Sequence, residues 1–152
     1  MQLIGLHSDF KINYFAVTKQ FNMTIFSKII AGEIPSYKIA ENEHFFAFLD
    51  IFPLQLGHTL VVPKIEVDKI FDVPDEYLSS LLTFAKPIAH AIEKAYPCNR
   101  VNIVTVGLEV PHAHVHLIPI NHLHDMDFTK EKLKLTPEQL KQVQDNVLSV
   151  LQ

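Results

Sequence analysis

Three histidines occupy alternate positions of a short apolar segment. They are His112, His114 and His116, within the run Pro-His-Ala-His-Val-His-Leu-Ile-Pro. Side chains alternate between the two faces of a β-strand, so a strand here would present all three imidazoles on one face. Imidazoles held in a row are costly unless polar partners satisfy them. The pattern therefore indicates a site of chemistry rather than simple packing.

An imidazole suits chemistry at phosphorus. With an ordinary pKa of about 6.5, a neutral histidine can attack an electrophilic centre and later act as a leaving group. Neighbouring imidazoles can donate hydrogen bonds to phosphate oxygens or pass a proton to the leaving group. His114 has a neighbour on each side, so the spacing favours it as the attacking residue.

Zinc binding is the alternative reading of the same histidines. On a strand that rises about 3.3 Å per residue, the Cα atoms of His112 and His116 would be ~13 Å apart, too far to share one ion easily. An adjacent pair could chelate zinc with a third ligand from elsewhere. Three further histidines could supply it: His58, His122 and His124. We predict no metal site, and a zinc-dependent hydrolase remains an alternative that chelator treatment would distinguish.

Composition limits the classes of function. The chain has 152 residues and a formal net charge of -4, which suits one domain and argues against sequence-independent nucleic-acid binding. Cys98 is the single cysteine, so no internal disulfide can form and a reducing compartment is expected. No apolar run approaches the roughly 18 residues of a membrane helix. We therefore predict a cytoplasmic protein that binds neither nucleic acid nor membrane.

The apolar spacing predicts alternating strands and helices from Met23 onward. Strands are expected at 37–41, 44–49, 58–62, 100–106 and 111–118, and helices at 26–31, 72–96 and 137–151. Short turns between the strands favour an α+β fold with a mostly antiparallel sheet. No glycine-rich phosphate loop is present among the 4 glycines.

The two longer helices carry their own signals. The final one opens with Thr136-Pro137-Glu138-Gln139, an N-cap residue, a first-turn proline and a capping-box glutamine. In the helix at 72–96, Pro87 predicts a kink. Its buried face is predicted to consist of Leu78, Leu81, Leu82, Ala85, Ile88, Ala89, Ile92 and Tyr96.

Four segments, in order, resemble the histidine-triad (HIT) family in its Hint-like branch. They are Ile25 to Pro35, Phe46 to Pro53, Gly57 to Lys64 and His112 to Pro119. The resemblance implies an α+β, HIT-like fold: a five-stranded, mostly antiparallel sheet with a long helix and shorter terminal helices. It also implies a homodimer that joins two sheets into one. Residues 23–152 would form this domain, and residues 1–22 an N-terminal extension that is either disordered or not native.

The resemblance further implies an activity without a cofactor. The family hydrolyses or transfers nucleotides at the α-phosphate, so purine nucleoside phosphoramidates or dinucleoside polyphosphates are the expected substrates. By the resemblance, the catalytic residues are His114, His112, His116 and His58. His114 is the nucleophile, His112 and His116 orient it and contact the phosphate, and His58 lies close to the phosphate. Asp50 binds the ribose hydroxyls. The matching apolar positions around the base are Phe26, Ile29, Phe48, Leu49, Ile51 and Leu60.

The chain departs from the family pattern just before the histidine row. Gly107 matches a family glycine, but Leu108 occupies the position of a glutamine and Glu109 that of a small hydroxyl residue. By their positions, Gly107 and Glu109 are expected to contact substrate. A carboxylate repels an anionic substrate unless it is protonated or faces a cationic leaving group. A catalytically weak, nucleotide-binding regulatory protein of the same fold is therefore the alternative function.

Overall fold

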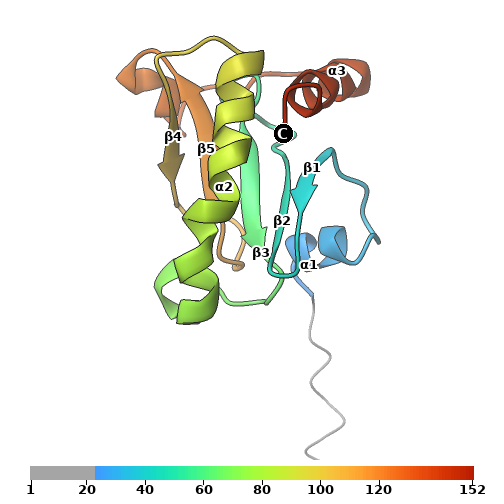
Figure 1. Ribbon diagram of the computed structural model, residues 1–152, viewed down its shortest axis with the longest axis vertical. Coiled ribbons are helices and arrows are strands. Elements are labelled where there is room, and N and C mark those ends of the chain that lie inside the picture. The colour runs from blue at the N-terminus through green and yellow to red at the C-terminus, as the bar shows by residue number, and fades with distance from the viewer. Residues whose placement is uncertain (1–22) are drawn as a thin grey trace, which may run out of the picture.

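The computed structural model describes residues 23–152, so the predicted extension at 1–22 lies outside the described residues. Within these residues, three α-helices and five strands make up the fold, with two short 3-10 helices between them (Figure 1). The helices are α1 (Ile25–Ile30), α2 (Asp75–Ala95) and α3 (Pro137–Leu148), and the 3-10 helices are η2 (Ile70–Asp72) and η3 (Leu123–Met126). The strands are β1 (Lys38–Glu41), β2 (Phe45–Leu49), β3 (Thr59–Pro63), β4 (Arg100–Val104) and β5 (Val115–Ile120).

The five strands form one sheet in the order β1-β2-β3-β5-β4. Every neighbouring pair is antiparallel, which confirms the predicted α+β architecture. The chain leaves β3, passes through α2 and enters the sheet again at the outer strand β4. It then returns through β5, which lies between β3 and β4. The strand that contains His116 is therefore an interior strand of the sheet.

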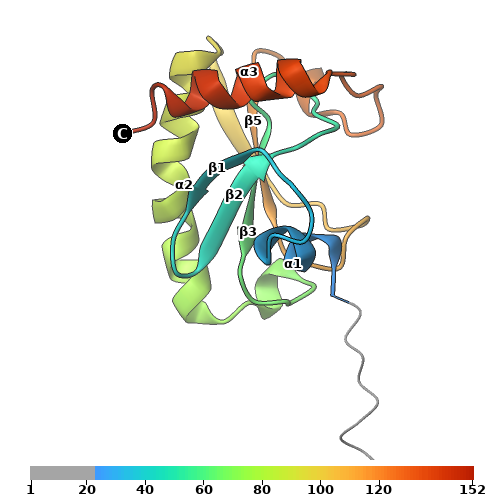
Figure 2. The same ribbon diagram turned by 90° about the vertical axis from the view of Figure 1, so that its right-hand side faces the viewer.

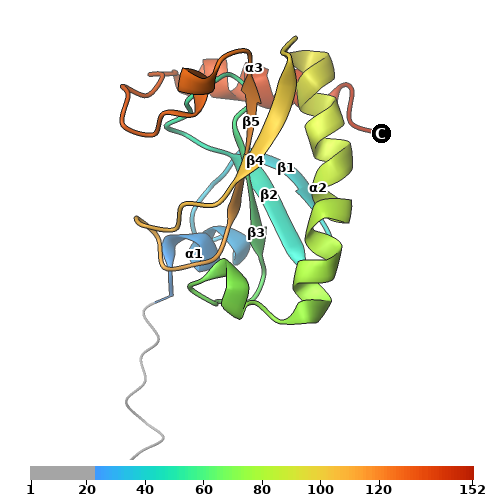
Figure 3. The same cartoon turned by 90° about the vertical axis from the view of Figure 1, so that its left-hand side faces the viewer.

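Alternating residues of the central strands supply two separate cores. In β2, Phe45, Ala47 and Leu49 pack on the side of α2, whereas Phe46 and Phe48 pack with Phe26 of α1. All five residues of β2 are buried, because helices cover both faces of the sheet at this point. Figure 3 shows α2 along one face and α1 on the opposite face, with α3 crossing one end, as Figure 2 also shows.

The long helix differs in detail from its prediction. It begins at Asp75 rather than at 72, because residues 70–72 form a 3-10 turn and Pro74 is the N-cap. Its buried residues are Leu81, Ala85, Ile88, Ala91 and Ile92. Leu82, predicted to be buried, is 63% exposed. No helix within residues 23–152 is both long and apolar enough to cross a membrane.

The histidine row lies only partly on a strand. The predicted strand at 111–118 begins at Val115 instead, so His112 and His114 belong to the loop before β5. The reason is a change of hydrogen-bond partner: the amide of Ala113 donates to the carbonyl of Val67, at 2.6 Å, and the ladder with β3 begins at Val115. The predicted strand at 100–106 similarly ends at Val104.

The capping box of α3 forms as predicted. The Thr136 hydroxyl accepts from the Gln139 amide, and the Gln139 side chain accepts from the Thr136 amide. The helix then buries Leu140, Val143 and Val147.

Removing this cap should destabilise the protein measurably. We expect Thr136→Ala to lower the free energy of unfolding by about 1 kcal/mol, because the first turn of α3 loses a hydrogen-bond acceptor. Urea titration of the two proteins measures the difference. Thr136→Ser keeps the hydroxyl, so a loss as large as that of the alanine variant would show that capping is not the cause.

Candidate active site

His114 is held in one tautomer by the backbone carbonyl beside it. Its Nδ1 atom lies 2.7 Å from the carbonyl oxygen of His112. A carbonyl only accepts, so Nδ1 carries the hydrogen and Nε2 keeps its lone pair. Burial lowers the pKa of His114, and the edge-on ring of Phe26 lies 5.0 Å away between centroids. The structure therefore presents a neutral imidazole whose Nε2 can act as a nucleophile.

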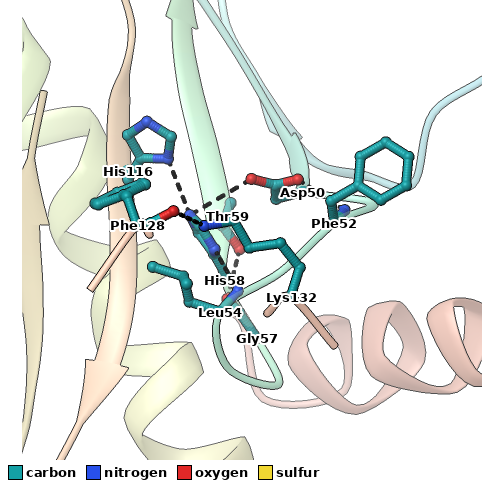
Figure 4. Close-up of polar contacts among 9 residues, drawn as sticks. All are labelled: Asp50, Phe52, Leu54, Gly57, His58, Thr59, His116, Phe128 and Lys132. Carbon is teal, nitrogen blue, oxygen red and sulfur yellow. Dashed lines mark hydrogen bonds and ion pairs between the residues drawn. The ribbon is translucent and has the colours of Figure 1, made fainter. Parts of the chain in front are cut away.

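His58 and His116 form a hydrogen-bonded pair between neighbouring strands (Figure 4). The backbone amide of Leu54 donates to Nδ1 of His58 at 3.1 Å, so the hydrogen of His58 is on Nε2. Nε2 lies 2.9 Å from Nδ1 of His116 and donates to it. The hydrogen of His116 is consequently on Nε2, where it remains available as a donor. Burial lowers the pKa of both imidazoles to about 3, which keeps them neutral.

A glycine gives His58 its place before β3. Gly57 has a φ of +91°, a conformation that favours glycine, and it turns the chain just before His58. A Cβ at this position would lie 3.0 Å from the ring of Tyr96. The sequence Gly57-His58-Thr59 therefore combines a turn, a buried imidazole and the first residue of a strand.

His112 is fully buried, and protein groups occupy both of its ring nitrogens. Nε2 donates to the carbonyl of Pro63 at 2.8 Å, and Nδ1 accepts from the hydroxyl of Thr24 at 2.8 Å. Ser27 and Glu66 extend this network, with the Ser27 hydroxyl donating to the carboxylate. Both ring nitrogens of His112 are thus bonded to protein groups, while its backbone carbonyl accepts from Nδ1 of His114.

Asp50 stands at the edge of the histidine pair. It follows β2, and one carboxylate oxygen accepts from the amide of Phe52 at 2.9 Å. The other oxygen is 3.7 Å from Nε2 of His58. Burial raises the pKa of Asp50 to about 6, against the opposing effects of the Phe52 amide and the charge of Lys132. The carboxylate is therefore ionised at neutral pH and can accept hydrogen bonds from hydroxyl groups.

Asp50, His58 and His116 also satisfy the spacing of a metal site. Each offers one ligand atom, and these atoms lie within 4.8 Å of one another. The hydrogen bond between the two imidazoles, however, uses Nε2 of His58 and Nδ1 of His116, the nearest nitrogens. The other predicted zinc ligands, His122 and His124, lie exposed outside this cluster.

The apolar residues predicted around the base divide into two groups. Phe26, Phe48 and Leu60 are buried together on the α1 face of the sheet, and Ile29 packs against them. Leu49 lies in the core on the opposite face, against α2. Ile51 is in the loop after β2 and is 51% exposed. The structure therefore brings four of these six residues to one wall beside the histidines.

The loop before the histidine row brings a carboxylate toward the site. Gly107 has a φ of +68°, Leu108 is 89% exposed, and Glu109 is exposed. The charge of Glu109 nevertheless contributes to raising the pKa of Asp50 and opposes the lowering of the pKa of His114. Glu109 therefore lies within electrostatic reach of the site, while Leu108 points to solvent.

The sequence did not predict several residues that contact the histidine row in space but lie far from it in the chain. Thr24, Ser27 and Glu66 hold His112, and the ring of Phe128 lies 5.0 Å from that of His116. Lys132 lies beside His58 in Figure 4. Thr24 carries a detectable signal as the N-cap of α1. No motif marks Phe128 or Lys132.

A five-stranded antiparallel sheet with a buried histidine row beside its central strand defines a protein of the histidine-triad type. The chain belongs to the HIT domain family, whose model matches residues 31–123. It is 44% identical over 96 residues to the adenosine 5'-monophosphoramidase HNT1 of Saccharomyces cerevisiae. That match covers 62% of this chain and 61% of the yeast protein, so the chain spans less than two thirds of that relative.

Solved structures show the same fold. A Hit-like protein of Bartonella henselae, described as involved in cell-cycle regulation, has a TM-score of 0.74 at 29% identity, covering 86% of this chain and 98% of that one. A zinc-bound histidine triad family protein of Mycobacterium smegmatis has a TM-score of 0.68 at 26% identity, covering 84% and 91%.

Proposed function

We propose that this protein hydrolyses or transfers nucleotides at the α-phosphate of purine nucleoside phosphoramidates or dinucleoside polyphosphates, through a covalent nucleotidyl intermediate on His114. The observation that carries the proposal is the hydrogen bond from Nδ1 of His114 to the carbonyl of His112, which leaves Nε2 unprotonated. The similarity to a yeast adenosine 5'-monophosphoramidase supports the same reaction class.

The chemistry divides into two displacements at phosphorus. Nε2 of His114 forms a bond to the α-phosphorus while the bond from phosphorus to the leaving nitrogen or oxygen breaks. Nε2–H of neutral His116 is placed to donate a hydrogen bond to the phosphate oxygens or to the leaving atom, and the leaving group takes up its proton from solvent water. Water then attacks phosphorus and releases a proton to solvent, the bond between phosphorus and Nε2 of His114 breaks, and a nucleoside monophosphate is released. His114 returns to its neutral state, and His116 stays neutral throughout.

Substrate binding would use the groups around the histidines. Asp50 has a half-buried, ionised carboxylate that can accept hydrogen bonds from ribose hydroxyls. The wall formed by Phe26, Phe48 and Leu60 offers an apolar surface to a base.

Direct trapping tests the covalent step. The protein is mixed with adenosine 5'-phosphoramidate, quenched in alkali within milliseconds, digested and analysed by mass spectrometry. We expect one adenylyl group on the peptide that contains His114. Turnover without an adduct on that peptide, over a full time course, would contradict the mechanism.

Nucleotide binding with little catalysis is a second candidate function. It is favoured by the loop before the row, where Leu108 is exposed and Glu109 carries a negative charge near the site. Calorimetry with AMP, together with a turnover assay on the same sample, separates the two functions. Micromolar binding with negligible hydrolysis would support the regulatory reading.

Metal-dependent hydrolysis is a third candidate, favoured by the spacing of Asp50, His58 and His116. We expect dialysis against a chelator to leave the rate of phosphoramidate hydrolysis within about twofold, because a histidine nucleophile needs no Lewis acid. The rate is measured before and after dialysis, with and without added Zn²⁺. A loss of activity that zinc restores would favour the metal-dependent reaction.

We also propose a cytoplasmic homodimer that extends the sheet across β4. Within residues 23–152, β4 is an outer strand of the sheet whose one neighbour is β5, and Ile103 on it is 40% exposed. Ile103→Glu should therefore convert a dimer to a monomer in light scattering at micromolar concentration, whereas Lys94→Glu, an exposed change on α2, should not. A wild-type monomer would contradict the dimer.

A further inference from the structure

The segment after η3 is built against the active site although it lies beyond the family match at 31–123. The amide of Leu133 donates to the carbonyl of Pro53 at 2.9 Å, which ties the segment to the loop that carries Asp50. The ring of Phe128 packs edge-on against His116, with 5.0 Å between centroids, and lies 6.5 Å from His58. The segment after η3 thus packs against the histidine pair and borders the site.

Lys132 belongs to the same segment and is positioned by Phe128. Its Nζ donates to the carbonyl of Phe128 and lies 5.3 Å from the centroid of the Phe128 ring. The side chain is half-buried, passes beside His58 and ends at the carbonyl oxygen of Phe128 (Figure 4). An ammonium group has three hydrogens, so two remain for other acceptors. The charge of Lys132 acts on Asp50, His58 and His116 alike, lowering the pKa of each.

Among residues 23–152, Lys132 is the one lysine or arginine whose charge acts on the pKa of Asp50, His58 or His116. His58, His114 and His116 are neutral, since burial lowers their pKa values, so they offer hydrogen bonds but no net charge. Asp50 and Glu109 place negative charge within electrostatic reach. An anionic phosphate among these groups would be repelled unless a cation were present.

We propose that Lys132, held by Phe128, is a phosphate-binding residue that gives this site its affinity for the charged phosphate of nucleoside 5'-phosphates. The inference rests on the proposed function. Lys132 lies after the residues that match the family, 31–123. The proposal therefore makes phosphate affinity depend on this chain's C-terminal segment as well as on the histidine row.

Binding of two probes tests the proposal. AMP and adenosine share the base and the ribose and differ in the phosphate, so calorimetry with both separates phosphate contacts from the rest. We expect Lys132→Gln to raise the Kd for AMP about tenfold and to leave the Kd for adenosine within about twofold. Lys132→Arg should recover most of the AMP affinity. Raising salt should weaken AMP binding to the wild type more than to Lys132→Gln.

The matched control is Lys130→Gln, which removes the same charge from the same segment. Lys130 acts on Asp125 and Asp127 rather than on the site, so AMP binding should stay unchanged. Equal losses for AMP and adenosine in Lys132→Gln would indicate a merely structural lysine and overturn the inference, as would unchanged AMP binding. If the wild type bound neither probe, the proposed function itself would fail, and the inference with it.

Discussion

Replacing His114 with alanine is expected to lower kcat/KM for adenosine 5'-phosphoramidate by about 10⁴-fold or more. The variant lacks the only atom proposed to bond to phosphorus, and removal of a nucleophile typically costs an enzyme at least this much. Steady-state and single-turnover kinetics measure the loss. The adenylyl adduct should disappear with it.

Binding should respond differently from turnover in this variant. Asp50, the apolar wall and Lys132 remain, so the affinity for AMP should change by less than about tenfold. The control is His90→Ala, an exposed histidine on α2, which should keep the wild-type rate. Substantial turnover by His114→Ala would assign the nucleophile to another group and refute the mechanism.

Acidification is expected to destabilise the fold strongly between pH 7 and pH 5. His58 and His116 have pKa values of about 3 in the folded protein, against 6.5 ordinarily, because burial opposes their charged forms. Between pH 7 and pH 5 these two imidazoles take up protons in the unfolded chain but not in the folded protein. The free energy of unfolding therefore has its full value above about pH 6.5 and decreases as the pH falls below it. Each of the two imidazoles lowers the free energy of unfolding by about 2 kcal/mol at pH 5.

Asp50 acts in the opposite sense. Its pKa is raised to about 6 in the folded protein, so the Asp50 carboxylate is protonated in the folded state before it is protonated in the unfolded chain. This uptake raises the free energy of unfolding by about 1 kcal/mol at pH 5. The expected net loss is about 3 kcal/mol, which urea titrations at the two pH values measure.

A histidine variant shows whether the buried pair is responsible. His116→Gln cannot be protonated, so its loss between pH 7 and pH 5 should be about 2 kcal/mol smaller than that of the wild type. Comparing each protein with itself removes any constant destabilisation. His90→Gln, at an exposed position, should match the wild type. Equal pH dependence in all three proteins would contradict the assignment.

Much of the fold was predictable because apolar periodicity reports which faces are buried. The helix at 137 and its capping box, the hairpin at 37–49 and the antiparallel sheet were all expected and are found. Errors arose where a tertiary partner decides. Leu82 fits the helical stripe but is exposed, and Ala91 is buried instead. His112 and His114 alternate like strand residues, but the bond from Ala113 to Val67 removes them from the ladder.

The sequence by itself determined the histidine row and its resemblance to the HIT family, and it predicted His114 as the attacking residue. Only the tertiary structure decided which nitrogen of each imidazole carries hydrogen, because those hydrogens depend on Leu54, Pro63 and the carbonyl of His112. It also decided that His58 meets His116 across 58 residues of chain, and that Lys132 joins them. Contacts of this kind depend on how strands and loops pack in three dimensions, so the spacing of residues along the chain does not predict them.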